Sequence, residues 1–196
     1  MIAPSLEADS LYPLVIDLHG ASGGEGDAHM HTDCYVEPFF EGMDVFILSP
    51  NGSIYSWPSL RNQEMVINLL VLALAQWPID PARVVVTGYS NGGNGAWYFG
   101  ETQPVLISAA IPMASSYSTT ASDGSTRVMP IPMYVIHGEN DELFPLAQTQ
   151  EWVNATIAVG SDVQLTVAPG LEHNEPCSYV PYLQEAVMWL QEEVWN

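Results

Sequence analysis

The chain contains no lysine and only three arginines among its 196 residues, against 23 aspartates and glutamates, so its formal net charge at pH 7 is −20. Such a surface repels nucleic acid and anionic lipid headgroups, which argues against a nucleic-acid-binding protein and favours neutral partners. Charged residues make up only 13% of the chain, which is low for a strict halophile. An ordinary acidic surface and an adaptation to salt both remain open.

Long hydrophobic runs are also missing. A membrane-spanning helix needs roughly 18 consecutive apolar residues, and the longest run, residues 65–77, is interrupted by Asn68 and Gln76. We therefore expect a buried helix there and no membrane span. The N-terminus carries no positive residue before an apolar stretch, so the chain shows no signal peptide. This leaves a cytoplasmic protein or the processed form of a secreted one.

At 196 residues, with no Pro/Gly/Ser-rich linker, the chain suits one domain over residues 1–196. Expected strands alternate with expected helices along it. Mostly apolar strands in such a βαβα order indicate a parallel sheet covered by helices on both faces. The expected strands lie near residues 14–18, 44–48, 83–87, 107–112, 133–137 and 163–167, and the expected helices near 31–41, 59–77, 92–103, 145–158 and 179–194.

The most informative segment is Val84-Val85-Val86-Thr87-Gly88-Tyr89-Ser90-Asn91-Gly92. A β-branched run leads directly into Gly-x-Ser-x-Gly, and a helix-compatible segment follows. A serine hydroxyl is a poor nucleophile unless the fold holds it in an exposed, strained turn beside a base, and a strand–turn–helix provides such a turn. The context predicts that Ser90 is a nucleophile.

A base, an acid and a glycine-rich loop occur in the order that a serine hydrolase of this type requires. Asp141 follows the apolar run of residues 133–136, and His173 follows the alternating strand near 163–167. Upstream, His19-Gly20-Ala21-Ser22-Gly23-Gly24 follows the first strand, where a backbone N–H can face a developing negative charge. We expect His19 to orient this loop.

These segments resemble the serine esterases of the α/β-hydrolase superfamily, in particular polyhydroxybutyrate-depolymerase-like and feruloyl-esterase-like enzymes and the small phospholipase/carboxylesterases. The similarity is carried, in family order, by LVIDLHGASGG, IDPARVVVTGYSNGG, PMYVIHGENDELFP and PGLEHNEP. The resemblance implies Ser90 as nucleophile, His173 as base and Asp141 as the orienting acid. It also implies an oxyanion hole formed by the backbone N–H groups of Ala21 and Asn91.

The chain departs from the family pattern in two places. Only about a dozen residues precede Leu14, whereas family members carry further strands there, so we expect a sheet of about six strands with a reduced N-terminal edge or an edge covered by a partner. The segment between Ile111 and Met133 is too short for a helical lid. We therefore expect an α/β-hydrolase fold with no cap domain.

Other residues compete for the catalytic roles. His137 precedes Asp141 and so stands in the wrong order for the base, which favours a packed structural histidine. Asp123 lies too early in the chain to be the acid, and Asp162 precedes a strand instead of following one. We expect none of the three to be catalytic.

The sequence gives little support to a metal or nucleotide site. Asp27, His29, His31 and Asp33 offer nitrogen and oxygen ligands but lack the spacing of a tetrahedral site, so a solvated rim of the active site is the better interpretation. The glycines after the first strand are not followed by the Gly-Lys-Ser/Thr of a phosphate-binding loop. We expect no metal and no cofactor.

Cys34 and Cys177 are the only cysteines. A bridge between them would pin the loop that carries His173, but two free thiols in a reducing cytosol are the default expectation. Sequence alone does not establish the distance that a disulfide needs.

The expected activity is hydrolysis of short-chain or small aromatic carboxylic esters through an acyl-enzyme. Tyr55, Trp57 and Tyr89 are candidate walls of the substrate site. The expected partner is a small neutral ester, and a homodimer remains open. A peptidase, an acyltransferase or a non-catalytic binding protein on the same scaffold is the alternative.

Overall fold

The structure of the protein is a computed structural model that describes residues 2–196. Six parallel strands form one sheet in the order β2-β1-β3-β4-β5-β6. Their bounds are β1 Tyr12–Leu18, β2 Phe46–Leu48, β3 Ile79–Tyr89, β4 Ala109–Met113, β5 Met133–Gly138 and β6 Val163–Ala168. The predicted parallel sheet of about six strands is confirmed, and each strand overlaps its expected range.

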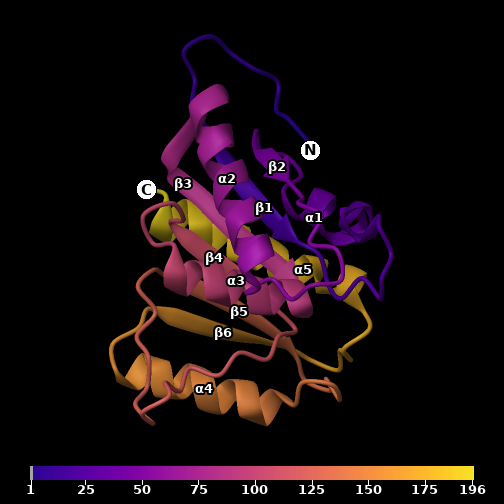
Figure 1. The fold of residues 1–196 in the computed structure, drawn as a ribbon, viewed down its shortest axis with the longest axis vertical. Helices are drawn as coiled ribbons and strands as arrows, with labels where there is room; N and C mark the ends of the chain where they lie inside the picture. Colours follow the sequence, from indigo (N-terminus) through magenta and orange to yellow (C-terminus); the bar gives the residue numbers. More distant parts are fainter. Residues whose placement is uncertain (1) are drawn as a thin grey trace.

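In residues 2–196, four α-helices connect strands and a fifth follows β6; Figure 1 shows their arrangement. They are α1 Asp33–Phe39, α2 Leu60–Gln76, α3 Asn91–Thr102, α4 Leu146–Ala158 and α5 Val180–Trp189. Short 3-10 helices occur at Ala28–Met30 and Pro176–Tyr179, and a π-helical turn, Leu190–Val194, continues α5. No helix in residues 2–196 is long and apolar enough to cross a membrane.

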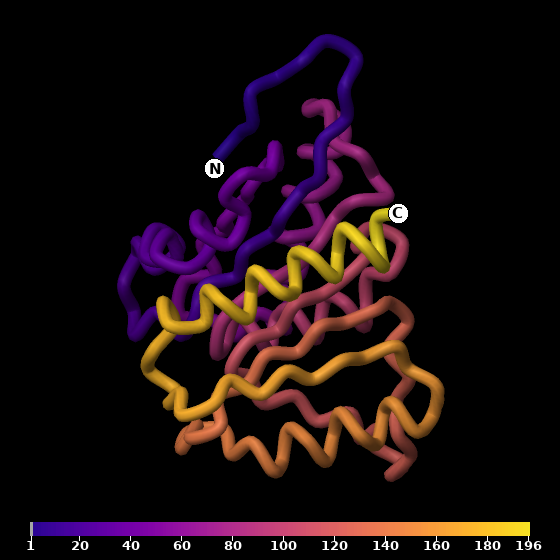
Figure 2. Tube along the Cα trace, turned by 180° about the vertical axis from the view of Figure 1, so that it is seen from behind, coloured from indigo at the N-terminus to yellow at the C-terminus, as the bar shows by residue number. Residues whose placement is uncertain are grey.

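The sheet separates two hydrophobic cores because successive strand residues point to opposite faces. Leu14, Ile16 and Leu18 of β1 pack with α2 and α3 on one face, whereas Val15 packs with α1 and α5 on the other. Figure 2, seen from behind, shows α5 crossing that second face of the sheet. Helices therefore cover both faces, as the sequence predicts.

The N-terminal edge of the sheet is partly covered by the chain itself. Ile2 and Ile47 of β2 form an isolated antiparallel bridge, with N···O distances of 2.9 and 3.0 Å. The sheet is reduced at this edge, as expected.

The connection between β4 and β5 takes the place where a lid would lie, and residues 114–132, all within the described chain, contain no helix. Arg127 fixes this segment to α3. Its side chain pairs with Glu101 of α3 at 2.6 Å and donates hydrogen bonds to the carbonyls of Ser118 and Thr120 within the segment. The site is therefore uncapped on this side.

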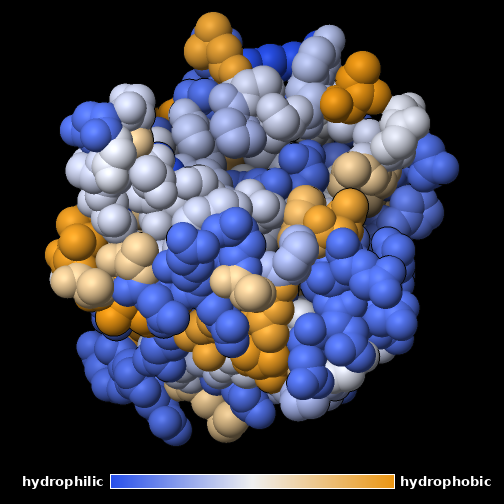
Figure 3. Space-filling view, turned by 90° about the horizontal axis from the view of Figure 1, so that it is seen from below, coloured by the Kyte–Doolittle hydropathy of each residue, from blue (hydrophilic) through white to orange (hydrophobic). Residues whose placement is uncertain are grey.

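Figure 3 views the molecule from the side on which α4 lies. Hydrophobic side chains form small separate groups there among hydrophilic ones, in keeping with the acidic composition. Arg83 pairs with Asp80 at 2.7 Å near the start of β3.

Candidate active site

Ser90 occupies the turn between β3 and α3, with φ 57° and ψ −117°. Positive φ is unfavourable for a residue with a side chain, at a cost of roughly 1–3 kcal/mol, and such strain collects at functional sites. The turn is held from below because the Ser90 N–H donates to the carbonyl of Met113 at 3.0 Å. The sequence-predicted strand–turn–helix is thus present around the serine.

Two glycines make this tight turn possible. A β-carbon on Gly92 would lie 1.7 Å from the carbonyl oxygen of Leu18, and one on Gly88 would lie 2.5 Å from the backbone of Gly92. Such contacts are impossible, so α3 can start this close to β1 and β3 only with glycine at both positions.

Three side chains from separate loops form a continuous hydrogen-bond chain. Ser90 Oγ lies 2.9 Å from His173 Nε2, and His173 Nδ1 lies 2.8 Å from Asp141 Oδ2. All three side chains are buried. Asp141 follows β5 and His173 follows β6, so the carboxyl ends of neighbouring strands bring them together.

The carboxylate of Asp141 is anchored through its other oxygen. Oδ1 accepts the N–H groups of Leu143 at 3.0 Å and Phe144 at 2.7 Å. This leaves Oδ2 free to orient the ring of His173. The rings of Phe144 and Tyr89 flank that histidine at centroid distances of 4.9 and 5.5 Å.

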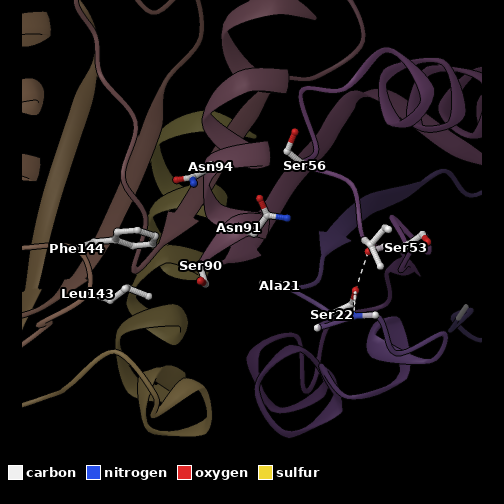
Figure 4. A pocket seen from close by; sticks show the side chains of 12 residues that line it. Ala21, Ser22, Ser53, Ser56, Ser90, Asn91, Asn94, Leu143 and Phe144 are labelled. Carbon is white, nitrogen blue, oxygen red and sulfur yellow. Dashed lines mark hydrogen bonds between the residues drawn. The ribbon is translucent and has the colours of Figure 1, made fainter.

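The glycine-rich loop after β1 lies beside Ser90, and Ala21 and Asn91 line the same cavity as the serine (Figure 4). Asn91 is the first residue of α3, where backbone N–H groups have no partner inside the helix and the helix dipole is positive. The two predicted oxyanion residues therefore share one cavity with the predicted nucleophile.

His19 connects the glycine-rich loop to the loop that follows β2. Its Nε2 accepts the N–H of Gly52 at 3.0 Å, so Nδ1 carries the proton and donates to the carbonyl of Gly20 at 2.6 Å. Burial lowers the pKa of His19, which favours this neutral form. Ser22 adds a second tie, because its hydroxyl donates to the carbonyl of Ser53 at 2.9 Å.

The expectation that Trp57 is a substrate wall is wrong. Its side chain is fully buried, lies under Gly52 and Gly95, and donates from Nε1 to the carbonyl of His19 at 2.9 Å. Trp57 therefore supports the glycine-rich loop from below. An aromatic residue in a Ser/Gly-rich loop cannot be assigned to solvent or core from sequence alone, because both are common.

The other two predicted walls lie beside the cavity. Tyr55 is exposed, stacks against Arg61 at 5.3 Å, and is not among the described residues that line the cavity. Tyr89 lines an adjoining cavity of about 330 Å³ that shares Ala21 and Ser22 with the first.

The cavity above Ser90 has a volume of about 580 Å³. Sequence reasoning missed its apolar walls, Ile54, Leu143 and Phe144. Each lies in a loop that follows a strand of the sheet, β2 or β5, and this placement was the available signal. The cavity is lined by Ala21, Ser22, Gly23, Gly24, Ser53, Ile54, Ser56, Ser90, Asn91, Asn94, Leu143 and Phe144.

The expectation of free thiols is also wrong, because Cys34 and Cys177 form a disulfide with a Cα–Cα distance of 5.4 Å. Helix α1 packs against α5 and the 3-10 helix before it, which brings two cysteines 143 residues apart into bonding range. The bridge joins the segment after the glycine-rich loop to the segment after His173.

Asp123, Asp162 and His137, the other candidates for the catalytic acid or base, are not part of the hydrogen-bond chain from Ser90 to Asp141. Asp123 bonds to Ser125 in the exposed β4–β5 connection, and Asp162 is exposed before β6. His137 is buried in β5.

In the predicted acidic rim, the exposed side chains of Glu25, Asp27 and His31 gather with ligand atoms within 4.8 Å of one another. His29 and Asp33 are not part of that group. Exposed clusters of this kind are common on acidic surfaces and do not by themselves define a metal site.

The fold and this serine–histidine–aspartate arrangement define an α/β hydrolase. The family model for phospholipase/carboxylesterase matches residues 43–189, and the chain belongs to that family. The match starts after the glycine-rich loop, so residues 19–24 lie outside it.

Solved structures share this fold. An esterase described as thermostable has a TM-score of 0.79 and 26% identity, with 97% of this chain and 57% of that chain covered. FphF, a fluorophosphonate-binding serine hydrolase of Staphylococcus aureus, has a TM-score of 0.77 and 15% identity, with 97% of this chain and 91% of that chain covered.

A curated relative from Bacillus subtilis (strain 168), the uncharacterized peptidase YuxL, is 22% identical over 216 residues. The alignment covers 86% of this chain but 32% of that protein. The chain thus spans about a third of the length of this relative and 57% of the thermostable esterase.

Proposed function

We propose that the chain is a serine carboxylesterase acting on short-chain or small aromatic esters. The observation that carries the proposal is the hydrogen-bond chain from Asp141 through His173 to Ser90, at 2.8 and 2.9 Å, which ends at a serine that lines a cavity. Membership of the phospholipase/carboxylesterase family supports ester hydrolysis over other uses of the same site.

In the proposed mechanism Ser90 Oγ attacks the ester carbonyl and His173 Nε2 takes the hydroxyl proton. Asp141 keeps the imidazole in the required tautomer and stabilises the imidazolium. The N–H groups of Ala21 and Asn91 bind the oxyanion, each contributing about 3 kcal/mol if they match a measured donor. His173 then gives its proton to the departing alkoxide, which leaves as the alcohol.

Water completes the cycle. His173 accepts a proton from water as the oxygen attacks the acyl-enzyme, and the proton returns to Ser90 when the acid is released. The reaction needs the neutral form of His173, so activity should be lost in acid. A profile that stays flat down to pH 4 would argue against this histidine as the base.

The substrate class follows from the shape of the cavity. Ile54 and Leu143 are largely exposed at its walls, so an acyl or aromatic group would contact them without being enclosed. An uncapped site stabilises a short chain nearly as well as a long one, because extra methylenes remain in water. Tyr89 would contact any part of the substrate that enters the adjoining cavity. The acidic surface favours neutral esters.

The experiment is hydrolysis of p-nitrophenyl esters from acetate to palmitate by wild type, Ser90→Ala and the remote control Ser10→Ala. We expect Ser90→Ala to lose activity by several orders of magnitude, as triad knockouts do, and Ser10→Ala to match wild type. The optimum should lie at or below about six carbons. Equal, slow hydrolysis by wild type and Ser90→Ala would refute the esterase proposal for these substrates.

A peptidase is the second candidate, and the relative named as a peptidase is the observation that favours it. The same triad can cleave an amide, so p-nitroanilides with matched acyl groups are the discriminating substrates. Faster Ser90-dependent cleavage of the anilides than of the esters would reverse the order of the two candidates.

A further inference from the structure

His137 is a buried histidine that the mechanism above does not use. It is the penultimate residue of β5 and its side chain is fully buried. Nε2 lies 2.7 Å from the carbonyl oxygen of Phe144 and 3.6 Å from Asp141 Oδ2. Both neighbours belong to the turn that carries the proposed catalytic acid.

The partners of His137 assign its tautomer. A carbonyl oxygen can only accept, so Nε2 carries the proton and donates to Phe144. Nδ1 has no hydrogen-bond partner within residues 2–196. Burial lowers the pKa of His137, against the opposing effects of the Phe144 bond and the Asp141 charge, so the ring is neutral and Nε2 is a fixed donor.

This donor closes the turn around Asp141. Phe144 is held at both ends of its backbone, because its carbonyl accepts from His137 while its N–H donates to Asp141 Oδ1 at 2.7 Å. Its ring also meets the ring of His173 edge-on at 4.9 Å. One hydrogen bond therefore restrains two groups that contact the proposed base: the carboxylate behind it and the aromatic ring beside it.

We propose that His137 is a positioning residue, whose Nε2–H holds the 141–144 turn so that Asp141 and Phe144 orient His173. The inference rests on the proposed roles of Asp141 and His173. A residue that merely fills space would be replaceable by any side chain of similar volume, whereas a positioning donor requires an N–H at the place of Nε2.

Glutamine and methionine provide the matched pair for this test, because they have nearly the same length and only glutamine can donate at the position of Nε2. Asparagine is a third variant: it is polar, but its amide corresponds to Nδ1 and is too short to reach Phe144. If His137→Met fails to fold, His137→Asn is the donor-free variant that is compared with His137→Gln.

We expect kcat for the best p-nitrophenyl ester to fall about 10- to 100-fold in His137→Met and His137→Asn, because small misplacements of catalytic groups cost this much. KM should stay within about threefold. His137→Gln should recover kcat to within about threefold of wild type, with an unchanged acid limb of the pH profile, since a neutral His137 contributes no titration. Thermal melting and near-ultraviolet circular dichroism check the fold.

Two results would overturn the proposal: equal losses of kcat in the glutamine and methionine variants, or wild-type kcat in a folded donor-free variant. A fluorophosphonate probe separates this outcome from failure of the esterase proposal. The probe phosphonylates Ser90 with loss of fluoride, and its rate reports how well His173 activates the serine without any ester. If wild type is labelled at Ser90 but hydrolyses no ester, the esterase proposal fails, and the order of labelling rates still tests His137.

Discussion

The two halves of the candidate site are built by different means. Asp141 and His173 lie within five residues of the ends of β5 and β6, are buried, and are held by hydrogen bonds inside the protein. The proposed oxyanion half combines Asn91, at the start of α3, with the loop of residues 19–26, in which Ala21 is exposed; this loop is bonded to a second loop, residues 51–57. The sheet positions the first half directly.

The second half depends on side chains that tie loop to loop. His19 joins the two loops through Gly20 and Gly52, and the indole of Trp57 holds the carbonyl of His19. Loops have fewer buried contacts than strands and open at lower free-energy cost. We therefore expect mutations in the two halves to differ in the size of their effects.

Asp141→Asn should give the largest loss. An amide in place of the carboxylate favours the wrong tautomer of His173, and in comparable triads this lowers kcat about 10⁴-fold. Steady-state kinetics on the best p-nitrophenyl ester measure it. The matched control is Asp162→Asn, the exposed rival acid, which should retain wild-type kcat. A loss in the control as large as in Asp141→Asn would remove the special role of Asp141.

The disulfide joins the two halves, and its removal should lower the free energy of unfolding substantially. A bridge between residues 143 apart lowers the entropy of the unfolded chain, and in the chain-entropy model this stabilises the folded state by about 5 kcal/mol. Urea unfolding of wild type with reductant should match Cys34→Ser/Cys177→Ser, and reductant should not change the double variant. If reductant leaves the wild-type midpoint unchanged, the bridge does not stabilise the fold.

Asp17 lies in β1, two residues before His19, and its carboxyl is fully buried, with Oδ2 3.4 Å from the Ser49 hydroxyl. Burial raises the pKa of Asp17 to about 7, against the lowering effect of hydrogen bonds from Thr32 and Ser49. The folded protein thus holds this proton more tightly than the unfolded chain, in which the pKa is near 3.8.

The contribution of the Asp17 proton to the free energy of unfolding is complete below about pH 4. It is lost as the pH rises to 7, which lowers the free energy of unfolding by up to about 4 kcal/mol. Asp17→Asn should therefore raise the unfolding free energy at pH 8 and change it little at pH 4. Urea midpoints at the two pH values measure this difference, with exposed Asp9→Asn as control. An effect of Asp17→Asn that is equal at both pH values would contradict the raised pKa.

Trp57→Phe should have the smallest effect on the oxyanion half. Phenylalanine keeps most of the buried ring but removes the N–H that holds the carbonyl of His19. We expect kcat to fall about 10-fold with KM nearly unchanged, because a looser loop binds the oxyanion less well than the ester. Trp195→Phe is the control, because it also removes an indole hydrogen bond, to the hydroxyl of Ser108, but neither residue lines the cavity. Equal kcat in the two variants would show that the Trp57 tie is dispensable.

Where the signal was local, the sequence predicted the structure well. The β-branched run before Ser90 and the glycines around it specify a strand, a turn and a helix within about twenty residues, and β3 and α3 lie there. The proposed acid, Asp141, and the proposed base, His173, were predicted from a similar local signal, because each follows a strand end. β2 was expected from residue 44 and starts at Phe46, a small error in a short strand.

Contacts between distant segments escaped sequence reasoning. Trp57 was expected at the substrate and lies under the loop, and Cys34 pairs with a cysteine 143 residues away. The role of His137 became visible only when the carbonyl of Phe144 was found within 2.7 Å of its ring.

The order of strands and helices, the parallel sheet and the serine turn can be predicted from the sequence alone, because they follow from hydrophobic periodicity and from glycine at positions where a β-carbon cannot fit. The three-dimensional packing was needed to see which side chains face the cavity, that the two cysteines meet, and which histidine we propose to support the acid. Those contacts depend on packing between loops far apart in the chain, and local residue preferences carry no information about such distances.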